Sequence, residues 1–157
     1  MKKRKTIALV AHDNRKQDLV EWVSFNYSIV LQHDLVCTGT TGRIVEKELT
    51  SRIKEDDAEH LEINITKLKS GPLGGDQQLG SLIVDGKIDC IIFFWDPMQP
   101  HPHDVDVKAL LRIAVLYNIP LACNRSSADF IISSPLIEKD YNRVVKDYSD
   151  YIGRDIN

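Results

Sequence analysis

The sequence has little of what marks secreted, membrane-spanning or nucleic-acid-binding proteins. Only 3 of its 157 residues are cysteines, at Cys37, Cys90 and Cys123. Their number is odd, their spacing is unlike that of a metal site, and each lies beside apolar residues, so we expect small reduced core residues of a cytoplasmic protein. The formal net charge of -3 argues against a general nucleic-acid surface, although a local group of cations can still bind a small anion.

Long apolar runs are also missing. The longest, IDCIIFFW, is much shorter than a membrane span. The first residues, MKKRKTIALVA, begin like a signal peptide, but their apolar run ends at HDNRKQ and is too short for one. The sequence has no internal repeat and no Gly/Ser-rich linker. With 43% hydrophobic and 27% charged residues, it is expected to form a single globular domain over residues 1–157.

Short apolar runs alternate with amphipathic segments along the chain. The runs predict strands at residues 5–11, 34–38, 62–68, 87–95 and 120–124. The segments between them predict helices at residues 13–33, 39–55, 77–86 and 104–118, and two helical stretches finish the chain. Strands that alternate with helices form parallel βαβ units with right-handed crossovers. The expected fold is α/β, a three-layer α/β/α sandwich around a mainly parallel sheet of about five strands.

Polar loops follow four of the predicted strands. They read HDNRK at 12–16, TGTTG at 38–42, SGPLGGDQQ at 70–78 and DPMQPHPHDVD at 96–106. Open α/β sheets bind ligands beyond the carboxyl ends of their strands, which is where these loops converge. The opposite ends carry turns such as VDGKID, without a comparable cluster. The convergence predicts an active site.

The loop TGTTG allows two interpretations. It can be a plain strand-to-helix turn, or its hydroxyls and backbone N–H groups can hold phosphate oxygens at a helix N-terminus. Lys16 is expected nearby, in the first turn of a helix, where a cation meets the unfavourable end of the helix dipole. A bound anion explains that position, and so does a solvated surface lysine. We favour anion binding, although the loop lacks the spacing of a Walker motif.

The loop after the fourth strand leaves three interpretations open. His101, His103, Asp104 and Asp106 belong to residue types that bind metals. Asp104 can instead cap the helix that follows it. A histidine with an ordinary pKa can also exchange protons with a substrate. The spacing alone does not distinguish these functions.

The glycine-rich loop raises a similar question about Asp76. Glycine costs backbone entropy, but it lets the backbone approach a ligand closely and leaves N–H groups for a phosphate or an oxyanion. Ser70 and Gly71 can then contact phosphate while Asp76 acts as a base on a substrate carbon. The alternative is that Asp76 caps the helix at 77–86. The two roles are compatible until a substrate is placed.

In order and spacing, these motifs resemble the methylglyoxal synthase family. The segments that carry the likeness, over nearly the whole chain, are ALVAHDNRKQ, TGTTG, SGPLGGDQQLG, FFWDP, PHDVDVKALLR and NIPLACN. The resemblance implies a lyase that converts dihydroxyacetone phosphate to methylglyoxal and inorganic phosphate, which bypasses part of glycolysis. It also implies that no metal or organic cofactor is needed, that inorganic phosphate is a possible regulator, and that the protein is a homohexamer.

The resemblance implies roles for individual residues as well. Asp76 matches the carboxylate that removes a proton from the hydroxymethyl carbon, and His103 matches the histidine that polarises the substrate oxygens and moves protons between them. Asp106 matches a supporting carboxylate. Asp13 and Asp96 match further acidic members. The family's substrate and phosphate contacts match His12, Lys16, Thr38, Gly39, Thr40, Thr41, Ser70 and Gly71.

Two features depart from the family pattern. Segment 43–69 looks longer than usual, which is expected to alter a surface helix or loop rather than the site. The family also supplies an arginine near the C-terminus to the site of a neighbouring subunit. Counting without gaps places Asp155 at that position, and a shift of one residue gives Arg154.

Three other functions compete with this one. The regulatory domain of carbamoyl phosphate synthetases shares the fold and binds phosphorylated or nucleotide effectors, but it is not expected to keep both Asp76 and His103. An isomerase of phosphosugars shares the enediolate step and differs in its products. A metal-dependent lyase or hydrolase differs in its sensitivity to chelators. We prefer the synthase over all three.

Overall fold

A five-stranded parallel sheet forms the centre of the protein. The computed structural model describes residues 1–58 and 60–153. The strands are β1 (Thr6–Ala11), β2 (Asp34–Cys37), β3 (Ile65–Lys67), β4 (Cys90–Phe94) and β5 (Leu121–Ala122). Their order in the sheet is β3-β2-β1-β4-β5, and every pairing is parallel. The predicted α/β fold is confirmed.

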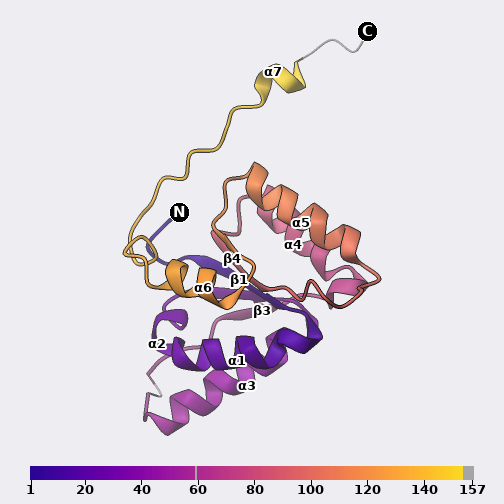
Figure 1. The fold of residues 1–157 in the computed structure, drawn as a ribbon. Coiled ribbons are helices and arrows are strands. Elements are labelled where there is room, and N and C mark those ends of the chain that lie inside the picture. The colour runs from indigo at the N-terminus through magenta and orange to yellow at the C-terminus, as the bar shows by residue number, and fades with distance from the viewer. Residues whose placement is uncertain (59, 154–157) are drawn as a thin grey trace.

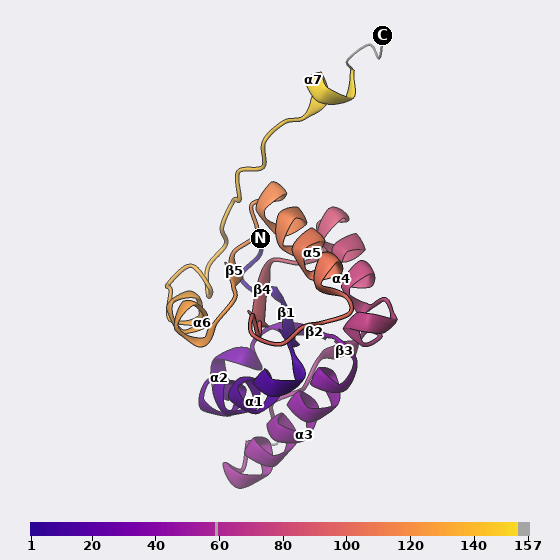
Figure 2. The same cartoon turned by 45° about the vertical axis from the view of Figure 1, so that its right-hand side comes forward.

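Helices cover both faces of the sheet (Figures 1 and 2). One face packs against α1 (Lys16–Phe25), α2 (Tyr27–Val30), α3 (Gly39–Glu55) and α6 (Arg125–Ile132). The other face packs against α4 (Gly75–Val84) and α5 (Asp104–Leu116). Two short 3₁₀ turns, η1 (Asp13–Arg15) and η2 (Gly71–Leu73), precede α1 and α4. The result is the three-layer arrangement that the alternating sequence pattern predicts.

The central strand β1 separates two apolar cores. Ile7, Leu9 and Ala11 pack into the core beneath α1, α3 and α6, whereas Ala8 and Val10 pack into the core beneath α4 and α5. Successive side chains of a strand point to opposite faces of the sheet. A strand that is buried on both faces therefore needs an unbroken apolar run, and this is why the run at 7–11 lacks alternation.

The helix predicted at 13–33 is interrupted in the structure. Residues 13–15 form η1, and α1 and α2 meet at Asn26. The side chain of Asn26 is buried and donates from Nδ2 to the carbonyl oxygen of Trp22, 2.9 Å away. Because this side chain competes with the backbone for a helical acceptor, it favours a break at this point. The apolar periodicity continues across the break, so the sequence pattern does not reveal it.

The strand order reverses direction at β1. The chain passes from β1 outward to β2 and β3, and it then crosses to β4 and β5 on the other side of β1. The loops after β1 and β4 are joined by two hydrogen bonds, from the N–H of His12 to the carbonyl of Phe94 (3.2 Å) and from the N–H of Asp96 to Nδ1 of His12 (3.1 Å). Such a reversal point is where open α/β sheets bind ligands.

The C-terminal segment leaves the body of the protein. Met1 and Tyr141 exchange backbone hydrogen bonds of 2.8 and 2.9 Å beside the amino end of the sheet. Beyond them the chain runs outward to the short helix α7 (Ser149–Ile152) (Figure 1). Within residues 1–58 and 60–153, no helix has the length and apolar character needed to cross a membrane.

Candidate active site

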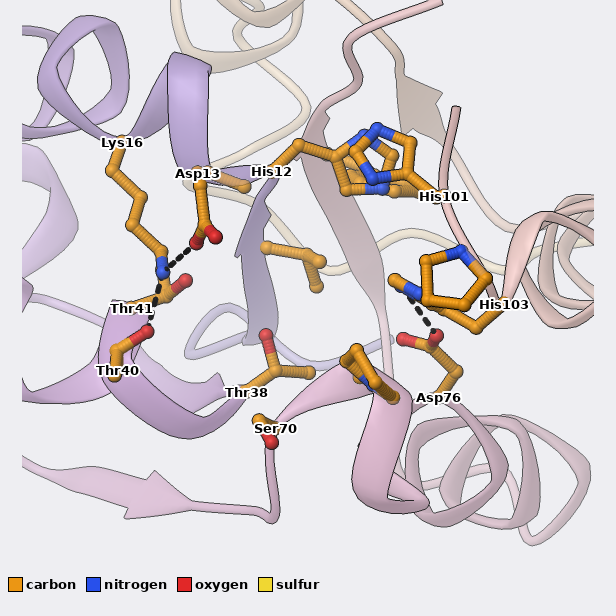
Figure 3. A pocket seen from close by; sticks show the side chains of 16 residues that line it. His12, Asp13, Lys16, Thr38, Thr40, Thr41, Ser70, Asp76, His101 and His103 are labelled. Carbon is orange, nitrogen blue, oxygen red and sulfur yellow. Dashed lines mark hydrogen bonds and ion pairs between the residues drawn. The ribbon is translucent and has the colours of Figure 1, made fainter. Parts of the chain in front are cut away.

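A cavity of about 470 Å³ lies at the carboxyl ends of the strands. Its walls come from the end of β1, the N-terminal turn of α3, η2 and the loop before α5 (Figure 3). The predicted site residues in its lining are His12, Asp13, Lys16, Thr38, Thr40, Thr41, Ser70, Gly71, Asp76 and His103. The other lining residues are Val10, Ala11, Pro72, Phe93, His101 and Pro102. The convergence of the four polar loops is thus present in the structure.

Asp76 is almost completely buried at one end of the cavity. Its exposed fraction is 4%, and its Oδ2 atom has no hydrogen-bond partner among residues 1–58 and 60–153. The N-cap of α4 is Gly74, and Asp76 lies within the first turn without a side-chain cap, so the capping interpretation is wrong. Burial raises the pKa of Asp76, the charge of His103 lowers it, and the charge of Asp106 raises it further. A carboxylate with a raised pKa is a stronger base.

Gly71 leaves the space in which Asp76 and His103 meet. Nε2 of His103 lies 3.5 Å from Oδ2 of Asp76 (Figure 3). A Cβ atom at Gly71 would lie 3.0 Å from each of these two atoms, closer than most real Cβ contacts. Any side chain at this position would therefore press on the carboxylate and the imidazole. This is the structural reason for a glycine directly after Ser70.

The ring of His12 is held in one tautomer. Its Nδ1 atom accepts the hydrogen bond from the N–H of Asp96, so in the neutral ring the proton is on Nε2. Nε2 is buried and has no partner within the described chain. Burial and the charges of His101 and His103 lower the pKa of His12 to about 4. His12 is therefore neutral at pH 7, and its Nε2–H is a buried donor on a residue that lines the cavity.

Two further histidines come from the loop before α5. The ring centroid of His101 lies 3.7 Å from that of His12, and the centroid of His103 lies 5.9 Å from it. His103 is the N-cap residue of α5, and Asp104 pairs with Lys108 at 2.8 Å without capping the helix, so the capping interpretation of Asp104 is wrong. Across the described ranges, no group of three or more His, Cys, Asp or Glu side chains is arranged to hold a metal ion.

The opposite end of the cavity is open and ionic. The ammonium of Lys16 contacts both the carboxylate of Asp13 and the hydroxyl of Thr40 (Figure 3). The side chain of Asp13 is 91% exposed, whereas that of Lys16 is only 24% exposed. The hydrogen bond and charge of Lys16 lower the pKa of Asp13. Lys16 is therefore a wall residue of the cavity with a fixed position.

The N-terminus of α3 adds hydroxyl groups at this end. Thr38 and Thr41 are buried, and the N–H groups of Thr40 and Thr41 fall in the first turn, where a helix has no internal acceptors for them. The N–H of Gly39 is different, because it donates to the carbonyls of Leu68 and Lys69 at 3.1 Å.

Gly39 is not one of the described residues that line the cavity. Its position follows from its packing against Ser70. Its φ is +31°, and a Cβ atom there would lie 2.7 Å from the Cα of Ser70. The glycine thus allows the 70–78 loop to approach α3 closely. It brings Ser70 to the cavity instead of offering a free amide.

Besides Gly39, two predicted residues among those described, Asp96 and Asp106, lie outside the cavity wall. Asp96 is buried beneath it and accepts hydrogen bonds from the N–H of Met98 (3.0 Å) and Nδ2 of Asn14 (3.2 Å). Asp106 lies behind Asp76, beside a smaller cavity between α4 and α5. Arg154 lies outside the described residues.

His101 is a titratable wall residue that the family resemblance did not supply. From the sequence it was only one of several candidates for metal binding or proton exchange in the loop after the fourth strand. Its signal was its position, two residues before His103 and between two prolines, at the carboxyl end of a buried strand.

Comparisons with known proteins agree with the geometry. The family model of the MGS-like domain matches residues 18–123. The methylglyoxal synthase of Maridesulfovibrio salexigens is 57% identical over 155 residues, which cover 98% of this chain and 99% of that protein. The methylglyoxal synthase of Leptospira interrogans is 50% identical over 151 residues, which cover 96% of this chain and 94% of that protein.

A solved structure has the same fold. The crystal structure of methylglyoxal synthase from Elizabethkingia anophelis superposes with a TM-score of 0.87 at 47% sequence identity. The superposition covers 100% of this chain and 95% of the other.

Proposed function

The chain belongs to the methylglyoxal synthase family, and we propose that it converts dihydroxyacetone phosphate to methylglyoxal and inorganic phosphate. The observation that carries this proposal is an almost completely buried carboxylate, Asp76, in the same cavity as a cation and a set of threonine hydroxyls. The buried carboxylate suits removal of a proton from carbon, and the cation and hydroxyls suit a phosphate group. The protein is then a carbon–oxygen lyase.

The first step is removal of a proton by Asp76. The C–H bond that breaks belongs to the hydroxymethyl carbon, and its electrons move toward the carbonyl oxygen to give an enediolate. Burial of Asp76 and the lack of a hydrogen bond to Oδ2 support this assignment, because both leave the carboxylate poorly solvated and more basic.

Two imidazoles can stabilise the enediolate. Nε2 of His103 lies 3.5 Å from Oδ2 of Asp76, and we assign to His103 the transfer of a proton between the substrate oxygens. His12 offers its Nε2–H as a neutral donor that is already oriented by the N–H of Asp96. Donors that are in place before the reaction stabilise developing charge without reorganisation, and they act more strongly in a site from which water is excluded.

The second step is loss of phosphate. After a proton has moved between the substrate oxygens, the oxygen on the former hydroxymethyl carbon forms a C=O bond, the C=C electron pair shifts to form a new C=C bond to the phosphate-bearing carbon, and the C–O bond to phosphate breaks. The released enol then rearranges to methylglyoxal. This elimination requires the C–O bond to stand out of the enediolate plane. We assign the grip that sets this torsion to Lys16, the hydroxyls of Thr38, Thr40, Thr41 and Ser70, and Gly71, because all of them line the cavity that Asp76 also lines.

The charge balance of the cavity favours a contribution from a second subunit. Lys16 is the only lysine or arginine among the described lining residues, and it already pairs with Asp13. A phosphate dianion leaves this end with net negative charge. We therefore also propose a homohexamer in which Arg154 of a partner subunit completes the phosphate site, with residues 1–157 acting as one domain.

The remaining assignments follow from the same proposal. We propose that the reaction needs no metal or organic cofactor and takes place in the cytoplasm. Asp96 and Asp106 would act through their neighbours, Asp96 by orienting His12 and Asp106 by its charge near Asp76.

Product analysis tests the proposal directly. The purified protein is incubated with dihydroxyacetone phosphate without added metal, and phosphate and methylglyoxal are measured together. We expect equal amounts of both, unaffected by a chelator. An isomerised sugar phosphate without free phosphate would identify an isomerase, and loss of activity on chelation would identify a metal-dependent enzyme.

A further inference from the structure

His101 is a partly buried polar residue that the proposed mechanism does not use. Its Nε2 atom is buried and has no hydrogen-bond partner within the described chain. The ring nevertheless lies in the wall of the cavity, next to two histidines that have roles in the reaction. A buried nitrogen atom without a hydrogen bond costs free energy, so the retention of this ring needs a reason.

The ring of His12 is fixed at one atom by hydrogen bonding. The N–H of Asp96 holds Nδ1 at 3.1 Å, but a single hydrogen bond still allows the ring to swivel about that atom. Two aromatic contacts remove this freedom. The ring of Phe93 stands at 89° to His12 with a centroid distance of 5.1 Å, and the ring of His101 lies against it at 3.7 Å and 39° (Figure 3).

The backbone of His101 is itself restricted. Pro100 precedes it and Pro102 follows it. Proline fixes its own φ and disfavours the helical region for the residue before it, so the chain at His101 has few conformations. A ring on such a backbone is a rigid surface against which another ring can be held.

We propose that His101 is a positioning residue: its ring and the peptide N–H of Asp96 together fix the ring of His12 so that the Nε2–H of His12 faces the substrate. This inference rests on the proposed function and extends it to a residue outside the implied site. His101 acts through His12, by packing, and its own nitrogens do not contact the substrate.

The charges around His12 support the same arrangement. The titratable groups that act on it or share its surroundings are His101, His103, Asp96, Asp13 and Asp104. Burial is the main cause of the lowered pKa of His12, and the charges of His101 and His103 lower it further. Removing the His101 ring exposes His12 and removes one repulsive charge, so both changes raise the pKa of His12.

Three variants test the proposal in the full-length protein. His101→Ala removes the ring, His101→Phe keeps an aromatic surface without nitrogen atoms, and His60→Ala removes an exposed histidine as the control. The protein has 5 histidines, so ¹⁵N-histidine NMR can follow each ring. We measure the tautomer and titration midpoint of His12, and kcat and KM with dihydroxyacetone phosphate.

The expected results separate packing from chemistry. In His101→Ala, kcat falls roughly tenfold, as expected for a misplaced donor, KM changes little, and the His12 signal shows a tautomer mixture and a higher titration midpoint. In His101→Phe and His60→Ala, the Nε2–H tautomer is kept and kcat stays near that of the wild type.

Two results would overturn the proposal. One is a His101→Ala variant whose His12 tautomer is unchanged, whatever its kcat, or whose kcat is unchanged although the tautomer mixes. The other is a His101→Phe variant that loses as much kcat as His101→Ala, because the imidazole nitrogens would then act themselves. Failure of the wild type to form methylglyoxal would refute the proposed function alone, since the NMR measurement needs no substrate.

Discussion

The two ends of the cavity hold aspartates in opposite environments. Asp76 is 4% exposed, accepts no hydrogen bond at Oδ2 from the part of the chain that the structure describes, and has a raised pKa. Asp13 has a side chain that is 91% exposed, pairs with Lys16, and has a lowered pKa. The two residues have the same side chain and share one cavity, so the contrast comes from their surroundings alone.

The contrast teaches how one cavity can both bind and react. At the end formed by Asp76 and His103, which we call the dry end, burial excludes solvent and makes the carboxylate more basic. At the end formed by Lys16 and Asp13, which we call the ionic end, an ion pair holds a cation in place for a phosphate group. Neighbouring titratable groups with pKa values moved apart are typical of acid–base sites. If the two ends act separately, substitutions at one end should change turnover and substitutions at the other should change phosphate binding.

Removing the base should have the largest effect. In Asp76→Asn, we expect kcat to fall by about 10³-fold, within the range for loss of a general base, because the amide cannot accept the proton. Phosphate binding at the ionic end should persist. Steady-state kinetics and exchange of the substrate C–H proton in D₂O measure the loss, and a thermal melt checks the fold. Near-normal turnover in this variant would refute the assignment of Asp76.

Crowding of Asp76 and His103 by a larger side chain at Gly71 should lower kcat nearly as much. In Gly71→Ala, the added methyl group meets Asp76 and His103 at 3.0 Å and displaces them. We expect kcat to fall by roughly 10²-fold, the cost of a misplacement near 1 Å, with a smaller change in KM.

A matched glycine in α4 provides the control for Gly71. A Cβ atom at Gly80 meets nothing within 4 Å. Gly80→Ala should therefore keep its activity and gain about 0.5–1 kcal/mol in the free energy of unfolding, because glycine is unfavourable inside a helix. Equal activity in the two variants would contradict the role given to Gly71.

Removing the cation tests the ionic end. In Lys16→Met, we expect kcat/KM to fall about 10- to 100-fold, from the loss of one charged hydrogen bond, and inhibition by inorganic phosphate to weaken. The control is Lys54→Met, at an exposed position near the end of α3. If Lys16→Met lowered kcat alone and left phosphate inhibition intact, the division into a binding end and a reacting end would be wrong.

The smallest effect is expected in the pH profile. The charge of Asp106 raises the pKa of Asp76, so Asp106→Asn lowers that pKa. Asp76 is then ionised at lower pH, and the acid limb of the kcat/KM profile moves to lower pH. Asp104→Asn on the same helix removes a carboxylate that pairs with Lys108 and should leave the limb in place. A shift to higher pH in Asp106→Asn would reverse the sign of the proposed interaction.

Much of the fold could be predicted from local patterns. The unbroken apolar run of β4 and the amphipathic period of α5 identify a strand and a helix without any knowledge of their neighbours. The break at Asn26 could not, because it depends on which carbonyl the buried side chain reaches. The capping interpretations of Asp76 and Asp104 failed for a related reason, since the N-cap positions of the two helices are taken by Gly74 and His103.

Part of the candidate site could be predicted from the sequence. Loops at the carboxyl ends of parallel strands converge whatever their composition, so the order of strands and helices was enough to group their polar residues. The different places of Gly39, Asp96 and Asp106 could not be predicted, because they follow from contacts between loops that are distant in the chain.

The order of strands and helices, and the loops that carry reactive groups, could be read from the amino-acid sequence, because both follow from short-range periodicity and from the rules of parallel sheets. The burial of Asp76, the ion pair of Asp13, and the contact between the rings of His101 and His12 became known only from the folded molecule. Burial and the distance between residues far apart in the chain are properties of the packed molecule, and they set the protonation and orientation of each group.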